Sequence, residues 1–411
     1  MNSSYPISKF REFIQKQSNT IWEDPVEFLR LLNETINDSA ENELLAKALD
    51  FSLPQMLKAE AREGNNNGLG LIQKFTYPLA NKLNISEQQA QWVVMTWASG
   101  LGLIEDSFTK EYQPLSKEEL QKKAKLWKSL PSIWKEIFIE HLNATISESN
   151  FEALERLHHL HKIDCTEKKV NDLEALALTP FLTELYLEHT RIEDLSPLKH
   201  LLYLRVLDID ETQVSSLVPL KDLKSLKHVS FSYTRVHNLE PLASCTELEV
   251  IEFWGCKVNT LQPLANLKKV QVLYCCETEI TSLEPLREWR ELRRLYCFLT
   301  KIDSIEPLRG LQNLEELDIS NTMVSSLEPL RGMQKLKTLN CGATKITSLD
   351  PLENCSNLQN LYFEQNDIVS IAALRNLKKL QEINWSHTLI TKADKEFFLR
   401  NNPDCKVVNV K

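Results

Sequence analysis

Residues 182–203 read LTELYLEHTRIEDLSPLKHLLY, and residues 204–225 read LRVLDIDETQVSSLVPLKDLKS. The two stretches share leucines, a threonine, a β-branched residue and a Pro-Leu pair in one register. The Pro-Leu pairs recur every 22 residues without an insertion, at Pro197, Pro219, Pro241, Pro263, Pro285, Pro307, Pro329 and Pro351. A fixed period of this length predicts a solenoid, in which each repeat forms one turn of a coil and stacks on its neighbours.

Two further columns of residues keep the same register. A threonine column consists of Thr190, Thr212, Thr234, Thr278, Thr300, Thr322, Thr344 and Thr388, with Cys256 and Asn366 in its two gaps. Two residues after each of these positions comes a β-branched residue, from Ile192 to Ile390. Alternation through Leu185-Tyr186-Leu187 predicts a short strand with one inward and one outward face. Pro197 then prevents the strand from continuing.

The repeated unit L-x-x-L-x-[apolar]-x-x-T-x-[I/V]-x-x-L-x-P-L-x-x-L resembles the leucine-rich repeat, in the short 22-residue class of internalins and phosphatase-regulatory subunits. The resemblance covers residues 151–411 and implies an α/β leucine-rich-repeat solenoid. In such a solenoid a parallel β-sheet forms the concave face, and short turns or 3-10 segments form the convex face. In this family an asparagine usually occupies the position of the threonine column, where its side chain forms a ladder of hydrogen bonds between turns. We expect the threonine hydroxyl to bond loop backbone between neighbouring turns in its place.

The front of the chain lacks the 22-residue signal and reads as helices. Asp24 with Pro25 marks a helix start, and capping boxes pair Ser86 with Gln89 and Ser116 with Glu119. The region Ile21–Leu103 resembles a helical module of bacterial multidomain signalling proteins, through Asp24-Pro25, the Leu44–Leu57 run and the stretch from Ser86 to Gly102. This resemblance implies a connector without catalysis in a bacterial protein.

These patterns predict four parts of the chain. Residues 1–112 form a helical domain, and residues 113–150 supply linker helices that cap the N-terminal end of the solenoid. Residues 151–392 form about eleven turns of 22 residues. Residues 393–411 form a C-terminal cap, with a closing strand over Cys405–Val410.

Composition narrows the classes of partner and compartment. The net charge of −9 is spread along the chain, and no basic stripe suits a phosphate backbone, so we expect no nucleic acid. No apolar run approaches the ~18 residues of a membrane span, and the polar N-terminus lacks the apolar core of a secretory signal. Most of the nine cysteines fall on repeat core positions, which indicates free thiols and a cytoplasmic protein.

Three stretches superficially suggest chemistry. Glu63–Gly70 is glycine-rich, but no Lys-Ser/Thr follows it, so a solvated loop is expected. His158, His159 and His161 lack further ligands at zinc spacing. Cys276 is expected to face the concave solvent, without an evident base nearby. We therefore expect no catalytic residue, cofactor or metal.

The register also assigns the outward face of the strands, because strand side chains alternate. Two groups of outward residues stand out, one acidic and one aromatic, and aromatic and arginine side chains are favoured in binding interfaces. Aromatic residues also simply suit strands, so this explanation stays open. The predicted partner-binding residues are Glu188, Asp208, Asp210, Glu252, Trp254, Tyr274, Cys276, Arg294, Tyr296 and Phe298.

The sequence thus predicts a non-catalytic adaptor or scaffold that binds a protein on its concave face. The expected partner carries an apolar anchor with basic surroundings. Two alternatives remain at this point. One is an enzyme or regulatory subunit with an unrecognised site in the helical domain, and the other is an internalin-like adhesin. The oligomeric state is left open.

Overall fold

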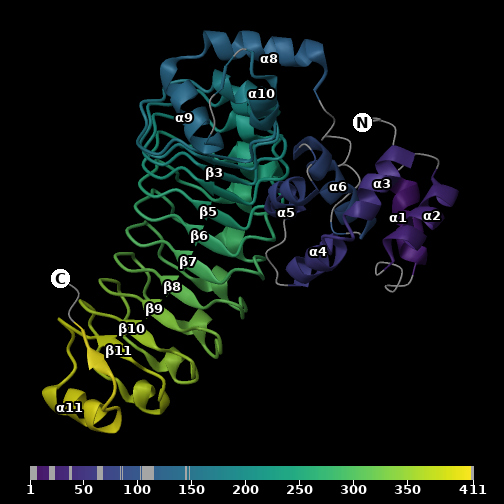
Figure 1. The fold of residues 1–411 in the computed structure, drawn as a ribbon. Coiled ribbons are helices and arrows are strands. Elements are labelled where there is room, and N and C mark those ends of the chain that lie inside the picture. The colour runs from purple at the N-terminus through teal and green to yellow at the C-terminus, as the bar shows by residue number, and fades with distance from the viewer. Residues whose placement is uncertain are drawn as a thin grey trace. The chain divides into compact units, whose positions relative to one another are not determined.

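The computed structural model describes residues 7–17, 24–36, 39–62, 68–83, 85, 87–101, 103, 115–143, 146–147 and 149–408. The chain divides into two compact units, Met1–Glu119 and Leu120–Lys411. The first unit is helical, and the second is a long parallel coil (Figure 1).

The described helices of the first unit surround one apolar core. They are α1 (Ile7–Lys16), α2 (Pro25–Thr35), α3 (Ser39–Lys47), α4 (Leu53–Arg62), α5 (Gly68–Leu83) and α6 (Glu87–Gly100). Helix α6 packs against α1, α3, α4 and α5. Its Trp97 is fully buried, stacks on Phe28 with ring centroids 5.4 Å apart, and donates from Nε1 to the carbonyl of Leu45 at 3.1 Å. This tryptophan therefore connects three helices.

The helix-start signals have different outcomes. Asp24 caps α2 as predicted, because its side chain accepts from the backbone N–H groups of Val26 and Glu27. The Ser116–Glu119 capping box is also confirmed, with Ser116 N donating to Glu119 Oε2 at 2.8 Å. Ser86 lies outside the described residues. The loop predicted over Glu63–Gly70 is wrong at its end, because α5 already begins at Gly68.

Three helices precede the sheet: α8 (Lys117–Ser129), α9 (Ser132–Leu142) and α10 (Phe151–His158). Helix α9 lies against the first strand and buries Trp134, Ile137 and Phe138, the residues expected to cover the open end of the core. Trp134 also donates to the carbonyl of Asp172 at 3.2 Å. The first 22-residue register differs from the expectation, since residues 151–158 form a helix.

Within the described residues, one sheet contains twelve strands in chain order. The strands are β1 (Lys162–Asp164), β2 (Glu184–Tyr186), β3 (Val206–Asp208), β4 (His228–Ser230), β5 (Val250–Glu252), β6 (Val272–Tyr274), β7 (Arg294–Tyr296), β8 (Glu316–Asp318), β9 (Thr338–Asn340), β10 (Asn360–Tyr362), β11 (Glu382–Asn384) and β12 (Lys406–Val407). All pairs are parallel, and each residue of β2 faces the residue 22 places later in β3. This arrangement confirms the leucine-rich-repeat solenoid.

Short 3-10 turns return the chain along the opposite side of the coil. They are η2 (Glu174–Leu178), η3 (Ser196–His200), η4 (Val218–Leu220), η5 (Glu240–Ser244), η6 (Gln262–Leu264), η7 (Glu284–Leu286), η8 (Glu306–Leu308), η9 (Glu328–Leu330), η10 (Asp350–Leu352) and η11 (Ala372–Asn376). Proline stands in the first turn of η3 to η10, where its missing N–H removes no hydrogen bond.

The inward columns form a continuous core between strands and turns. Cys165, Cys275, Cys297 and Cys341 are fully buried in the inward strand column, as predicted. Phe231 and Phe253 occupy the same column and stack with centroids 5.4 Å apart. Each 22-residue turn of the coil, which we call a rung, buries its aliphatic side chains against the next rung. The solenoid is therefore stable only as a stack of rungs.

The prediction for the threonine ladder is wrong. Each hydroxyl donates to a carbonyl of its own turn, as Thr190 Oγ1 does to Leu187 O at 2.7 Å, and not to loop backbone of a neighbouring turn. Thr344 Oγ1 also contacts the next rung, through the side chain of Asn366, whose Oδ1 lies 2.8 Å away. Asn366 and Cys256, which occupy the column in place of threonine, do donate hydrogen bonds to backbone of the previous rung. Asn366 Nδ2 donates to Cys341 O at 2.8 Å, and Cys256 Sγ donates to Phe231 O at 3.2 Å. The threonine side chain is too short to reach the backbone of a neighbouring rung by itself.

Backbone bonds connect the turns instead. The residue before each threonine has positive φ, as at His189, Glu211, Tyr233 and Leu299. Its N–H donates to the carbonyl of the next rung, for example Glu211 N to Ser232 O at 2.8 Å. Of the residues at this turn position, Gly255 is the one glycine.

The C-terminal end is closed by helix α11 (Lys392–Asn401) and by β12. Thr391 caps the helix, and Phe398 packs edge-on against Trp385 of the last full rung, with centroids 5.6 Å apart. The closing strand is shorter than predicted, and residues 409–411 lie outside the described part. Among the described helices, none combines the length and apolarity needed to cross a bilayer.

Candidate functional site

The outward side chains of the sheet form three columns along the concave face. The first column starts each strand, the second ends it, and the third lies two residues beyond the second. All ten predicted partner-binding residues stand in these columns. They form two groups, an acidic group on β2 to β5 and an aromatic group on β5 to β7.

The acidic group centres on Asp210, which is half-buried between neighbouring rungs. Its Oδ1 accepts from Ser230 Oγ and from Ser232 N, both at 2.6 Å. Burial nevertheless raises the pKa of Asp210 to about 6, and the charge of Asp208 contributes to the rise. Burial also raises the pKa of Asp208. The fold therefore keeps two adjacent carboxylates in an environment that disfavours their charge.

Two histidines lie against the other carboxylates of this region. His228 Nε2 is 3.0 Å from Glu252 Oε1. His189 lies between Glu188, at 3.5 Å, and Glu211, at 3.0 Å. Glu188 and Glu252 both remain partly accessible to solvent.

Four aromatic side chains, Trp254, Tyr274, Tyr296 and Phe298, form one layer that we call the aromatic patch. Tyr274 and Tyr296 stack with centroids 4.4 Å apart and an interplanar angle of 2°. Trp254 meets Phe298 edge-on at 5.3 Å and Tyr274 at 6.5 Å. All four rings remain partly exposed. The structure thus brings together residues from three consecutive rungs.

The prediction that Cys276 faces the concave solvent is wrong. Its position in the outward column is as expected, but the residue is 0% exposed. Trp254 and Phe298 occupy the same column on the rungs before and after, and their rings meet over the small cysteine. Burial raises the pKa of the Cys276 thiol to about 12. Cys276 is therefore the floor of the aromatic patch, and its thiol is not available to a partner.

One acidic and one basic residue, Glu316 and Arg294, lie at the margin of the patch. The hydroxyl of Tyr296 donates to Glu316, and burial together with this carboxylate raises the pKa of Tyr296. Arg294 is exposed, and among the described residues no carboxylate lies within ion-pair distance of its guanidinium. Its charge is available to a partner.

Sequence reasoning missed two residues beside the patch, Tyr233 and Leu299. Both occupy the positive-φ position of their turns and are 49% exposed. A Cβ at Gly255 would lie 2.5 Å from the Tyr233 ring, so the ring rests directly on the backbone next to Trp254. The 22-residue register could have identified both residues, because it places them one residue after the third outward column.

The face as a whole is acidic. Among its described outward positions, the Lys and Arg residues are Lys162, Arg294 and Lys406. The acidic residues of the same columns are Asp164, Glu184, Glu188, Asp208, Asp210, Glu252, Glu316, Asp318, Glu364 and Glu382.

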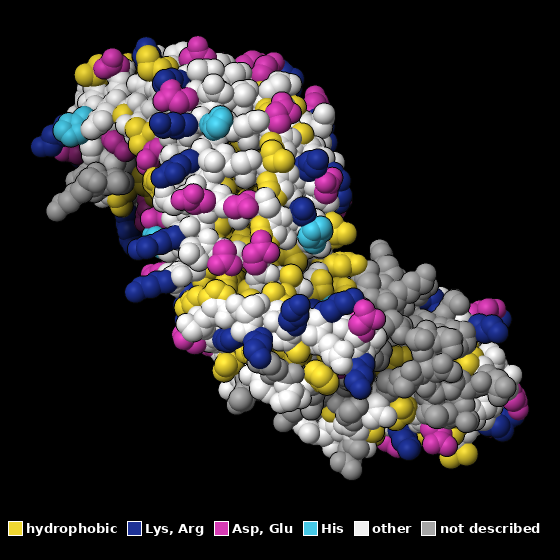
Figure 2. Space-filling view, turned by 90° about the horizontal axis from the view of Figure 1, so that it is seen from above, with side chains coloured by type: hydrophobic (Ala, Val, Ile, Leu, Met, Phe, Trp, Pro, Cys, Tyr) yellow, Lys and Arg dark blue, Asp and Glu magenta, His cyan; other side chains and the backbone are white. Residues whose placement is uncertain are grey.

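Other surfaces balance their charges locally. Lys227 pairs with Glu249 at 2.7 Å and Lys269 with Glu247 at 2.6 Å, each across one rung. In the view of Figure 2, Lys and Arg side chains lie close to Asp and Glu side chains over much of the solenoid. The excess of acid on the concave columns is therefore a local property.

The other residues considered for chemistry are the histidines before the first strand and the cysteines. Burial lowers the pKa of both His158 and His159 to about 3, and the His159 ring stacks on Phe181 at 5.6 Å. Within the part of the chain that the structure describes, no three His, Cys, Asp or Glu residues are grouped to hold a metal ion. All nine cysteines are buried and free.

Comparisons with known proteins agree with this geometry. Residues 312–354 match the family model "Leucine Rich repeats (2 copies)". An internalin (inlF) from Listeria monocytogenes is 21% identical, with a TM-score of 0.58 over 68% of this chain and 91% of that one. InlJ from Listeria monocytogenes, whose functional domain includes a cysteine ladder, is 19% identical, with a TM-score of 0.54 over 62% and 54%.

A more distant likeness is to the plant peptide hormone receptor RGFR1 in complex with RGF2. It is 16% identical, with a TM-score of 0.51 over 58% of this chain and 41% of that one. No curated protein matches the chain. The repeat register, the twelve parallel strands and the family match together identify the chain as a leucine-rich-repeat protein.

Proposed function

We propose that this chain is a non-catalytic adaptor that binds a protein partner on the concave face of its repeats. Leucine-rich-repeat proteins generally mediate protein–protein interaction. The observation that carries the proposal is the aromatic patch, since four partly exposed rings on three adjacent rungs form one apolar surface of the kind that serves as an interface centre. RGFR1, of similar fold, was solved in complex with RGF2, which supports recognition of a polypeptide by this architecture.

The partner that suits this surface has an apolar anchor with basic surroundings. The anchor would pack on Trp254, Tyr274, Tyr296 and Phe298. Basic groups would lie over Asp208, Asp210, Glu188 and Glu252, with an acidic group opposite Arg294. Such charge complementarity mainly raises the association rate and selects against wrong partners. Binding should therefore weaken as salt increases.

The test is capture of the native partner from the source organism by the full chain and by a variant that carries Trp254→Ala and Tyr296→Ala. Loss of a protein captured by the wild type is expected. The matched control replaces two exposed convex residues, Leu202 and Val218, with alanine and should capture normally. Undiminished capture by a correctly folded patch variant would refute the role of the concave face.

We also propose a tethering role for the helical unit and a cytoplasmic location in a bacterium. The location is supported by nine free, buried thiols, which suit a reducing compartment. Cell fractionation tests it, and recovery at the cell surface would favour the adhesin alternative, for which the internalin-like fold is the supporting observation. An enzymatic site in the helical unit has no specific observation in its favour.

A further inference from the structure

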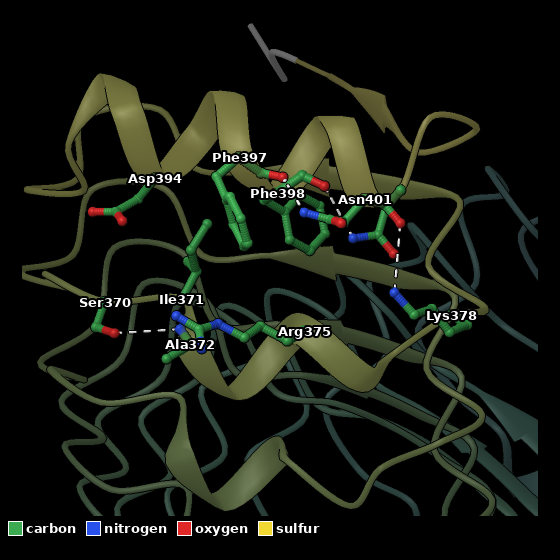
Figure 3. Close-up of a pocket in the computed structure, with 10 residues that line it drawn as sticks. Ser370, Ile371, Ala372, Arg375, Lys378, Asp394, Phe397, Phe398 and Asn401 are labelled. Atoms are coloured by element: carbon green, nitrogen blue, oxygen red, sulfur yellow. Dashed lines mark hydrogen bonds between the residues drawn. The ribbon is translucent and has the colours of Figure 1, made fainter.

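A cavity of about 230 Å³ lies at the C-terminal end of the solenoid, between η11 and α11. In Figure 3 the rings of Phe397 and Phe398 extend from α11 toward η11, and Arg375 lies along the opposite side. Lys378 stands at one end of the cavity, and Ser370 and Asp394 stand at the other. A cavity of about 150 Å³ already holds a benzene molecule, so this one can accommodate an aromatic side chain.

The chemistry of the cavity favours an apolar group that carries acidic neighbours. Arg375 lies 5.8 Å from the centre of the Phe397 ring, and Lys378 Nζ is 3.5 Å from the carbonyl of Asn401. Among the described residues, neither cation has a carboxylate within 4.0 Å. Asp394 is held by Thr391 at the start of α11, 2.6 Å from its hydroxyl. The cavity thus combines aromatic walls with two available positive charges.

One described surface of the same chain has the complementary chemistry. Tyr233 lies on a turn with a φ of 54°, where its ring rests on Gly255 and the residue is still 49% exposed. Partial burial and then the charges of Glu277 and Glu211 raise the pKa of its hydroxyl, which places both carboxylates near the ring. A bulky side chain at positive φ costs about 1 kcal/mol or more.

We propose that the Tyr233 edge of one copy docks in the C-terminal cavity of a second copy. The Tyr233 ring would lie between Phe397 and Ile371, with Glu211 and Glu277 facing Arg375 and Lys378. The two contact surfaces differ, so the association is head-to-tail and leads to a ring or an open filament. The inference goes beyond the adaptor role and does not depend on the aromatic patch.

Sedimentation velocity of the full chain over a range of concentrations tests this proposal. The wild type is expected to form dimers and larger species that dissociate at high salt. Tyr233→Ala should remain monomeric, as should the double variant Arg375→Glu and Lys378→Glu. The first variant retains an intact cavity and the second an intact tyrosine edge. An equimolar mixture of the two should therefore form dimers and nothing larger.

Controls distinguish this proposal from the adaptor role. Lys199→Glu with Lys221→Glu reverses two exposed charges on the convex side and should associate like the wild type. Circular dichroism verifies the fold of each variant. A wild type that is monomeric at every concentration overturns the proposal, as does a mixture that stays monomeric. Either result leaves partner capture through the aromatic patch unaffected, because that experiment uses other residues.

Discussion

The turn residues show how single side chains can depart from what the backbone favours. Ten turns repeat one conformation with positive φ, from His189 to His387, and nine of the ten residues there are not glycine. Left-handed backbone is unfavourable for residues with a Cβ, and most of all for bulky ones. Hydrogen bonds from these residues to the next rung hold the conformation in place.

Replacing Leu299 with glycine should stabilise the solenoid by about 0.5–1 kcal/mol, because glycine adopts positive φ without strain and Leu299 is half-exposed. Urea unfolding measures the change. The matched control is Leu202→Gly, at a leucine with 52% exposure that is not among the positive-φ residues. The control should lose stability, and a loss at both positions would contradict the strain argument.

Replacing Asp210 with asparagine should stabilise the protein at pH 7 by roughly 1–2 kcal/mol after allowance for solvent screening. The folded state raises the pKa of this group to about 6 from an ordinary 3.8. An acid with a raised pKa destabilises the fold above that pKa, and the penalty disappears as the pH falls below the unfolded value. The gain should therefore be full above pH 6 and absent below about pH 4.

The asparagine keeps an oxygen for Ser230 and Ser232, so the hydrogen bonds persist. Chemical unfolding of both proteins at pH 4 and pH 7 measures the difference. A gain that is equal at both pH values would show that charge is not its cause. Asp222, exposed on the convex side, supplies the control, since Asp222→Asn should change little at either pH.

Among the elements, the neighbouring strands determine what each outward side chain experiences. Strand alternation predicts direction, and it placed Cys276 in the correct column. It does not predict whether an outward side chain is shielded from solvent. Cys276 is shielded here by the larger side chains of Trp254 and Phe298, one rung away on either side. Trp254 and Phe298 are therefore structural as well as exposed, because they shield a thiol between them.

Replacing Trp254 with alanine should make Cys276 reactive toward iodoacetamide in the native protein. In the wild type all nine thiols are buried, and a pKa raised to about 12 leaves Cys276 protonated. Mass spectrometry of alkylated peptides gives the rate at each site. The adjacent Cys275 faces the core and should stay protected in both proteins. Equal labelling of both cysteines would indicate unfolding, and no labelling would contradict the cover.

The secondary-structure elements also show which structural features can be predicted from the sequence. The period of 22 predicts strands, turns and inward columns, because each depends on a residue's own repeat. The threonine bonds and the burial of Cys276 could not be predicted, because they depend on side-chain length and on distances between rungs. The C-terminal cavity was equally inaccessible, since its walls come from η11 and α11, and no repeat pattern sets their spacing.

At the scale of the whole molecule, the solenoid needs both of its ends covered. Each rung is stabilised by its neighbours, so the last rung depends on the cap. Phe398 is buried against Trp385, and truncating such a buried aromatic residue costs about 3–5 kcal/mol. The loss should be concentrated in the rungs next to the cap.

We expect Phe398→Ala to increase amide hydrogen exchange in β10 and β11 and to leave β2 to β4 unchanged, because stability in a stack of repeats is local. Exchange followed by mass spectrometry measures both regions in one experiment. Phe397→Ala is the matched control, since Phe397 is 53% exposed and should contribute little. Uniform loss of protection along all rungs would indicate that the coil unfolds as a single cooperative unit.

The main-chain bonds between successive turns have an evolutionary consequence. These bonds use only peptide groups. Individual residues of the outward columns can therefore be substituted while the backbone structure of the solenoid is preserved. Duplication of any internal stretch of 22 residues would insert one more rung and repeat its display, so a copy of residues 250–271 would carry a second tryptophan equivalent to Trp254. New recognition surfaces can thus arise from this gene by duplication of repeats and substitution of their outward residues, while the fold stays the same.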